Sequence, residues 1–190
     1  MTAGWRLNRV VDRGAIFAGW VGVGMAVTIV ISFLLVIPIE PIAWLLSPFA
    51  GLLIGYYANQ RSNRRAGPWL RILVNGLYAG LLTAITFALL ILAVKALFFF
   101  ADSGYRDATQ GGQVTCSTGA ECVYRRYLDS GRGPDLTAAG VTDAATFASF
   151  YWNQQLATAL ALVGLTMAGA AGGAAVYGLT RPRRAELSAA

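Results

Sequence analysis

The stretch 72–101 carries a single charged residue, Lys95, and a single strongly polar one, Asn75. A helix of about 20 residues crosses the roughly 30 Å hydrocarbon core of a bilayer. No soluble domain of this size needs a buried helix as long as this one, so the stretch predicts a transmembrane helix. The composition agrees, because 56% of the 190 residues are hydrophobic and only 13% are charged.

Three further apolar runs predict three more membrane spans. Pro38, Glu40 and Pro41 separate the first two runs, and prolines end helices because they lack a backbone donor. The expected fold is therefore an all-α integral membrane protein with four transmembrane helices. Its expected segments are an N-terminal lead (1–14), a first transmembrane hairpin (15–58), a basic loop (59–71), a third helix (72–101), a long loop (102–146), a fourth helix (147–180) and a basic tail (181–190).

The distribution of charge predicts how the chain is threaded. The lead, the basic loop and the tail hold ten arginines and two acids, whereas the remaining segments hold four arginines, Lys95 and seven acids. Loops rich in Lys and Arg stay on the cytoplasmic side of a membrane. Both termini and the loop 59–71 are therefore expected to be cytoplasmic, and 102–146 is expected to be extracytoplasmic.

Short similarities suggest an internal repeat. The sequence Ala15-Ile-Phe-Ala-Gly19 aligns with Gly76-Leu-Tyr-Ala-Gly80, and each opens an outward span after a basic segment. Phe49-Ala-Gly51, followed by Gly55, aligns with Met167-Ala-Gly169, followed by Gly173. Two tandem helical hairpins, in a parallel 2+2 repeat, account for both matches. Chance similarity between spans rich in Gly and Ala is the alternative.

Glycines at one-turn spacing mark candidate packing faces. Small residues let helix backbones approach closely in a membrane, where lipid supplies no hydrophobic drive between helices. Such faces serve either packing within the four-helix bundle or contact with a partner helix or a second copy. The glycines concerned are Gly51, Gly55, Gly76, Gly80, Gly169 and Gly173.

Lys95 is the one ionisable side chain inside the apolar runs, and a charge at membrane depth is a candidate functional group. It lies near the outer end of its span, where its ammonium group can extend to the interface. Pairing with Glu40 or Asp102, or contact with a substrate, are the alternatives.

Cys116 and Cys122 are the two cysteines of the chain, and both lie in the segment expected outside the cytoplasm. Oxidising compartments favour disulfides, so we expect these two residues to form a structural disulfide. A catalytic redox pair is more typically spaced as C-x-x-C.

The chain contains no histidine, which excludes imidazole-ligated haem, imidazole metal sites and His-based catalytic triads. No nucleotide-binding loop or metal-ligand cluster is visible either, so neither a cofactor nor a metal is expected. The net charge of +6 resides beside the apolar runs, where it sets topology, and nucleic acid is not an expected partner.

The layout of four spans, both ends inside, a short first outer loop and a long second one with cysteines resembles that of tetraspanins. The Cys-Cys-Gly motif and multi-cysteine pattern of that family are absent here, so the resemblance implies a layout and no residue or activity. The Ala, Gly and Arg usage suggests a bacterial plasma-membrane protein.

These observations predict a non-enzymatic membrane subunit. It would be an accessory, assembly or structural component of a larger complex or a homo-oligomer, with membrane lipids and other membrane subunits or itself as partners. The alternative is a small oligomeric channel or facilitator for a neutral or hydrophobic solute, which requires deep threonines and glycines of both hairpins to face one cavity. An enzyme acting on lipids or thiols is the weakest of the three hypotheses.

Overall fold

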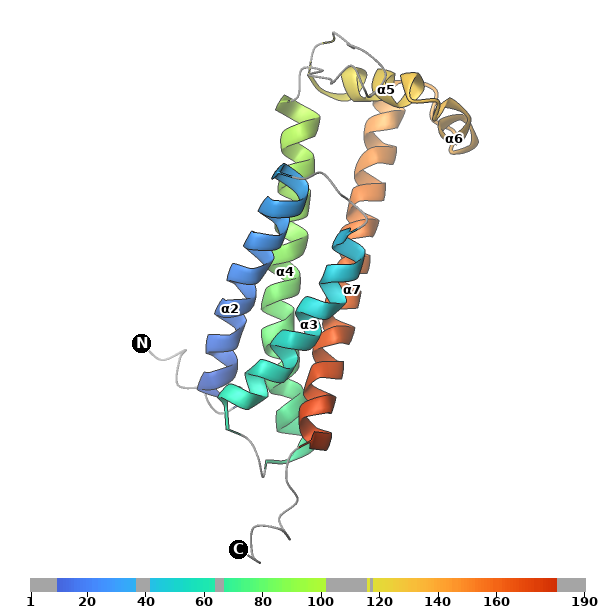
Figure 1. The fold of residues 1–190 in the computed structure, drawn as a ribbon. Coiled ribbons are helices and arrows are strands. Elements are labelled where there is room, and N and C mark those ends of the chain that lie inside the picture. The colour runs from blue at the N-terminus through green and yellow to red at the C-terminus, as the bar shows by residue number, and fades with distance from the viewer. Residues whose placement is uncertain (1–9, 37–41, 64–66, 102–115, 117, 181–190) are drawn as a thin grey trace, which may run out of the picture. The chain divides into compact units, whose positions relative to one another are not determined.

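The computed structural model describes residues 10–36, 42–63, 67–101, 116 and 118–180 (Figure 1). Within these ranges the regular elements are helices, with no β-strand, which confirms the all-helical class. The long elements are α2 (Arg13–Val30), α3 (Ile42–Arg61), α4 (Trp69–Ala101) and α7 (Ala144–Thr180). Shorter ones are the π-helix η1 (Ile31–Val36), α5 (Ala120–Asp129) and α6 (Gly133–Ala138).

Four helical segments of the described chain are long and apolar enough to cross a membrane. They are Arg13–Phe33, Ile42–Arg61, Trp69–Ala101 and Ala144–Thr180. The prediction of four candidate spans is thereby confirmed, and these helices indicate a membrane protein.

The helix ends differ from the predicted limits by a few residues, each for a local reason. α4 starts three residues before the predicted 72, because the carbonyl of Pro68 accepts hydrogen bonds from the backbone N–H groups of Arg71 and Ile72. α7 starts at Ala144, before the predicted 147, because Asp143 caps it. Two helices, α5 and α6, lie within the predicted loop 102–146.

The chain divides into two compact units. Unit 1 comprises Met1–Ile91 and Leu160–Ala190, and unit 2 comprises Leu92–Ala159. α4 and α7 therefore each contribute to both units. In unit 1, α2, α3 and the corresponding parts of α4 and α7 run side by side (Figure 1). Its packing relies on small side chains, and the buried positions of α2 are Ala15, Ala18, Gly19, Gly22, Ala26 and Val30.

Candidate functional site

A close helix contact in unit 1 is the seam between α3 and α7, made by Gly51, Gly55, Gly169 and Gly173. A Cβ atom added to Gly51 would clash with the carbonyl oxygen of Thr166, and one added to Gly55 would clash with that of Ala170. Each glycine thus lets the opposite backbone approach to a distance that no side chain permits. Since contacts advance in the same direction along both helices, α3 and α7 run parallel.

The seam has two-fold pseudosymmetry. A Cβ atom on Gly169 would clash with the carbonyl oxygen of Pro48, and one on Gly173 would clash with that of Leu52. In the alignment that pairs Gly51 with Gly169, Pro48 is the counterpart of Thr166 and Leu52 is the counterpart of Ala170. Equivalent residues therefore make equivalent contacts across the seam.

The glycines of α4 pack against the same part of α7. A Cβ atom on Gly76 would lie 2.7 Å from the Cβ of Ala174, and one on Gly80 would clash with the Cβ of Ala170. All six glycines singled out from the sequence are thus engaged within unit 1. By contrast, Gly24, Gly164 and Gly172 have no atom within 4 Å of the position that a Cβ would take.

Three deep threonine hydroxyls of unit 1 are used inside their own helices. Thr83, Thr86 and Thr166 donate hydrogen bonds to the carbonyls of Ala79, Leu82 and Leu162, one turn earlier, at 2.8–2.9 Å. This is the usual way for a helix to satisfy a threonine in an apolar setting. These hydroxyls therefore do not converge on one site.

A polar network joins α2 to α4 at the end of unit 1 where both helices begin. The side-chain Nδ2 of Asn75 donates to Oδ2 of Asp12 at 2.8 Å, and the backbone N–H of Asp12 donates to Oδ1 of Asn75 at 3.0 Å. Arg71 forms an ion pair with Asp12 at 3.3 Å. The carboxylate is 12% exposed and Asn75 is fully buried. The network fixes the register of the two helices.

The sequence marks Asn75 as the one strongly polar residue of its span, but it does not reveal the partnership with Asp12. The available signal was the isolation of Asp12, the one acid in a basic lead, directly before the first helical residue. At the same end Asn59, also fully buried, donates from Nδ2 to the carbonyls of Gly55 and Ile72 at 3.1 and 2.9 Å. This second amide links α3 to α4.

Unit 2 has an aromatic core. Its buried residues come from α4, α5, α6, the turn before α7, and α7 itself: Phe99, Val123, Leu136, Val141, Phe147 and Tyr151. Phe147 is fully buried, with ring centroids of Tyr124 and Tyr127 at 5.5 and 5.0 Å. Aromatic pairs at such separations are favourable beyond their burial. The described residues 118–143, between the last two spans, are therefore part of a packed module.

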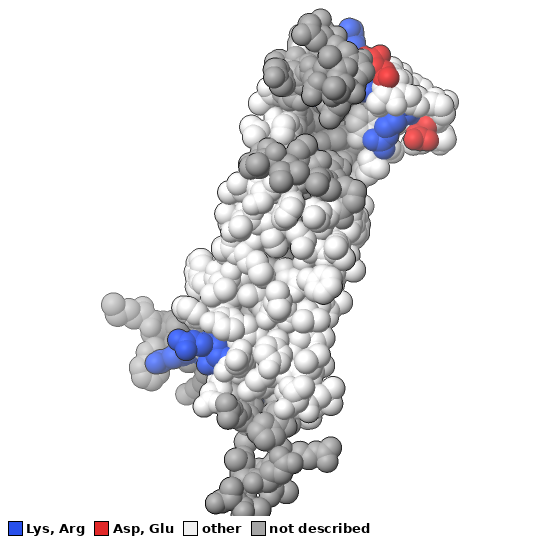
Figure 2. Space-filling model, viewed as in Figure 1, with Lys and Arg blue, Asp and Glu red and all other residues white. Residues whose placement is uncertain are grey.

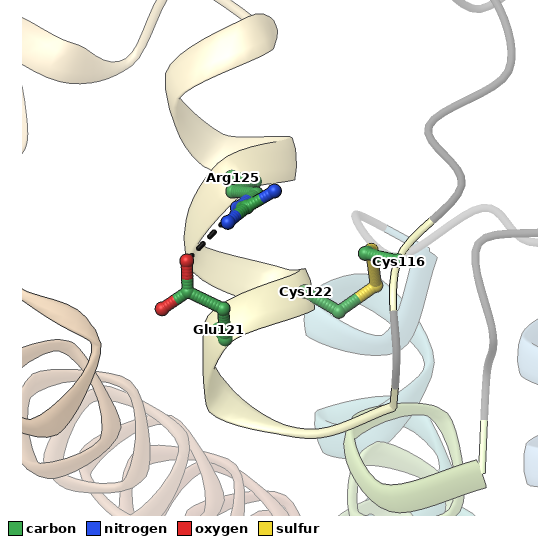
Figure 3. The surroundings of a disulfide bond; sticks show 4 residues. All are labelled: Cys116, Glu121, Cys122 and Arg125. Atoms are coloured by element: carbon green, nitrogen blue, oxygen red, sulfur yellow. Dashed lines mark hydrogen bonds and ion pairs between the residues drawn. A yellow bond between two sulfur atoms is a disulfide. The ribbon is translucent and has the colours of Figure 1, made fainter.

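The disulfide between Cys116 and Cys122 holds the start of α5 (Figure 3). Cys122 is fully buried, and the backbone N–H of Gly119 donates to the carbonyl of Phe99 at 3.1 Å. Nearby, Glu121 and Arg125 form an exposed ion pair at 2.8 Å, one turn apart (Figure 3). Exposed pairs of this kind contribute little stability, so the disulfide and the aromatic core carry the module.

Lys95 lies half-buried on α4 in the part that belongs to unit 2. The partners considered for it, Glu40 and Asp102, lie outside the described residues. Within the described part of the chain, no group of three or more His, Cys, Asp or Glu residues is placed to hold a metal ion.

Comparison of the chain with protein-family models, curated protein sequences and solved structures finds no match.

Proposed function

We propose that this protein is a non-enzymatic integral membrane subunit that binds a partner protein through unit 2. The observation that carries the proposal is the packed module with an aromatic core and a disulfide between the last two spans. A mere connection between helices needs no core of its own, and long ordered segments of this kind commonly serve recognition.

The proposed setting is a bacterial plasma membrane, with both termini and the loop 59–71 in the cytoplasm and unit 2 outside it. The excess of arginine in the three proposed cytoplasmic segments supports this threading. The disulfide supports an extracytoplasmic position for unit 2.

We also propose that the four spans arose as two tandem hairpins. The support comes from the pseudosymmetric seam, where the glycines of α3 and α7 that align in sequence also make equivalent contacts. Chance could produce two Gly-rich segments of similar sequence in α3 and α7. Chance similarity does not by itself favour equivalent contacts made by the aligned residues of the two segments.

The seam glycines are poor candidates for the partner face, because the opposite helix of the same chain already occupies their surface. Unit 2 instead presents an exposed apolar side chain, Leu128, on α5, at 42% exposure. Arg132 follows Leu128 by four residues in the sequence. Its guanidinium lies 4.4 Å from the ring centroid of Tyr127. Aromatic, aliphatic and arginine side chains together are typical of binding surfaces.

The channel alternative finds less support. It requires a cavity shared by deep threonines and glycines. Thr83, Thr86 and Thr166 instead bond to carbonyls of their own helices, and the six glycines contact neighbouring helices. We therefore propose the subunit function alone.

The proposal is tested by purifying the tagged full chain from its native membrane in mild detergent and identifying copurifying proteins by mass spectrometry. A stoichiometric partner should accompany the wild type and be lost from Leu128→Asp. The matched control is Thr137→Asp, which places the same charge at an exposed position of α6 and should retain the partner. Retention of the partner by Leu128→Asp, or the absence of a stoichiometric partner from the wild type, would count against the proposal.

A further inference from the structure

Two arginines from different helices lie at one end of unit 1. Arg13 is the first residue of α2, and Arg61 is the last residue of α3. Gly14 brings the two helix ends together, since a Cβ atom added to it would lie 2.6 Å from the carbonyl carbon of Arg61. Both arginine side chains are exposed. Figure 2 shows Lys and Arg side chains gathered at this end, beside a surface without charged side chains.

Neither arginine is neutralised within the described chain. No ion pair involves Arg13 or Arg61 there, and the nearby acid, Asp12, is engaged by Arg71 and Asn75. The guanidinium of Arg61 instead lies 5.3 Å from the ring centroid of Phe17, a cation–π contact. This contact holds one positive charge over the first turn of α2 and leaves its hydrogen-bond donors available.

An apolar face of α2 continues from these charges. Arg13 and Phe17 are four residues apart, hence on the same side of the helix. Phe17 and Trp20 are 49% and 68% exposed, and Val21 is exposed as well. One turn further along, Gly24 is exposed with no atom within 4 Å of a potential Cβ, so the helix backbone is accessible there.

We propose that Arg13 and Arg61 bind the phosphate of an anionic phospholipid whose acyl chain lies along Phe17, Trp20 and Gly24. Guanidinium groups bind phosphate oxygens through paired N–H donors, which an ammonium group does not reproduce. The shape supports a lipid, because the two charges lie at the end of an exposed apolar face. A soluble phosphate compound would use the charges and leave that face uncovered.

This inference does not depend on the proposed partner protein or on which side of the membrane this end of unit 1 occupies. It requires only that the four apolar helices cross a bilayer.

The test uses the full chain in detergent, with phosphatidylglycerol and phosphatidylcholine of identical acyl chains as probes and native mass spectrometry as readout. The wild type should retain phosphatidylglycerol in preference to phosphatidylcholine. Arg13→Gln/Arg61→Gln should reduce that preference by about 30-fold, since each arginine near an anionic headgroup contributes roughly a five- to sixfold effect.

The matched control is Arg125→Gln/Arg132→Gln in unit 2. It removes the same charge from two exposed arginines, and Arg132 makes an equivalent cation–π contact with Tyr127. This control should keep the wild-type preference. An equal loss in both double variants would show a general effect of net charge and would overturn the site.

Three further measurements distinguish binding of the whole lipid from binding of its headgroup alone, from a pure effect of charge, and from a folding defect. Inorganic phosphate at 10-fold excess over the lipid should leave phosphatidylglycerol bound, and complete displacement would overturn the role of the acyl chain. Arg13→Lys/Arg61→Lys keeps both charges and should restore only part of the preference. Unchanged thermal unfolding of the glutamine variant establishes that it is folded, and unchanged lipid preference in that folded variant would contradict the proposal.

Discussion

Gly51 of α3 and Gly169 of α7 occupy equivalent positions in a parallel helix contact, each lying against the backbone of the helix that carries the other. Gly51 lies against the carbonyl of Thr166, and Gly169 lies against the carbonyl of Pro48. Pro48 and Thr166 are aligned when Gly51 is paired with Gly169. The approach is possible because neither residue has a Cβ atom. The seam is therefore sensitive to added volume.

Substitution of seam glycines by alanine should destabilise the protein. Gly51→Ala and Gly169→Ala should each lower the unfolding free energy by about 3 kcal/mol, at the upper end of the range for overpacked positions, because the new atom meets backbone that cannot rotate away. Thermal unfolding in mild detergent measures the effect.

The controls for the seam are Gly164→Ala and Gly172→Ala on the same helix. Both positions have open space where a Cβ would go, so alanine should be neutral or stabilising by up to about 1 kcal/mol through helix propensity. Equal unfolding temperatures for Gly169→Ala and Gly172→Ala would refute the seam.

Removal of the amide of Asn75 should also destabilise unit 1. Asn75→Ala breaks both hydrogen bonds to Asp12 and leaves a largely buried carboxylate with fewer donors. The expected cost is about 2 kcal/mol. Gln60→Ala, at an exposed position at the end of α3, is the control and should have little effect on the unfolding temperature. If the two variants unfold alike, the network is not important for stability.

Loss of the disulfide should loosen unit 2 and leave unit 1 intact. Cys116→Ser/Cys122→Ser should cost about 2 kcal/mol by the chain-entropy model for a short loop, confined to the start of α5. Hydrogen exchange should therefore accelerate in 120–129 and stay unchanged in 42–61, and reduction of the wild type should reproduce this pattern. Acceleration in 42–61 to the same degree would show that the disulfide supports the spans as well.

The cap of α7 should depend on pH. Asp143 accepts a hydrogen bond from the backbone N–H of Thr146 at 2.8 Å, and from its hydroxyl at 2.8 Å. These donors, the backbone group first, lower the pKa of Asp143 below its usual value. Because the pKa is lower in the folded state, the stabilisation is present above the usual carboxyl pKa and is lost as the pH falls through the lowered value.

Asp143→Ala should therefore lower the unfolding temperature at neutral pH by a few degrees, with a much smaller effect at a pH below the lowered pKa. Thermal unfolding of wild type and variant across the acid range gives the comparison. Asp143→Asn, which retains a capping oxygen, should lie between them at neutral pH. A difference between wild type and Asp143→Ala that is constant with pH would exclude the charge of Asp143 as its source.

Hydropathy and length predicted the four apolar helices to within a few residues, because a bilayer requires long uninterrupted runs and leaves little choice of structure. The early start of α7 has its own local signal, an aspartate three residues before a threonine, which the aromatic residues from Phe147 onward obscured. The helices α5 and α6 were missed because their stability comes from the aromatic core, which joins residues distant in sequence.

Which surfaces the glycines occupy was not predictable from their spacing. Gly169 and Gly172 look alike in sequence, yet one lies on the α3 backbone and the other has open space beside it. The rotation of each helix about its own axis determines which glycine faces a neighbouring helix. That rotation depends on contacts between helices, such as those of Asn75 and Asn59.

If this chain is a subunit of a larger membrane assembly, the mass of the intact particle released from native membranes in mild detergent should show it. We expect the particle to contain a defined partner protein, so that its mass exceeds that of any number of copies of this chain alone by the mass of that partner. A particle made only of this chain, with solute flux after reconstitution alone in liposomes, would contradict it.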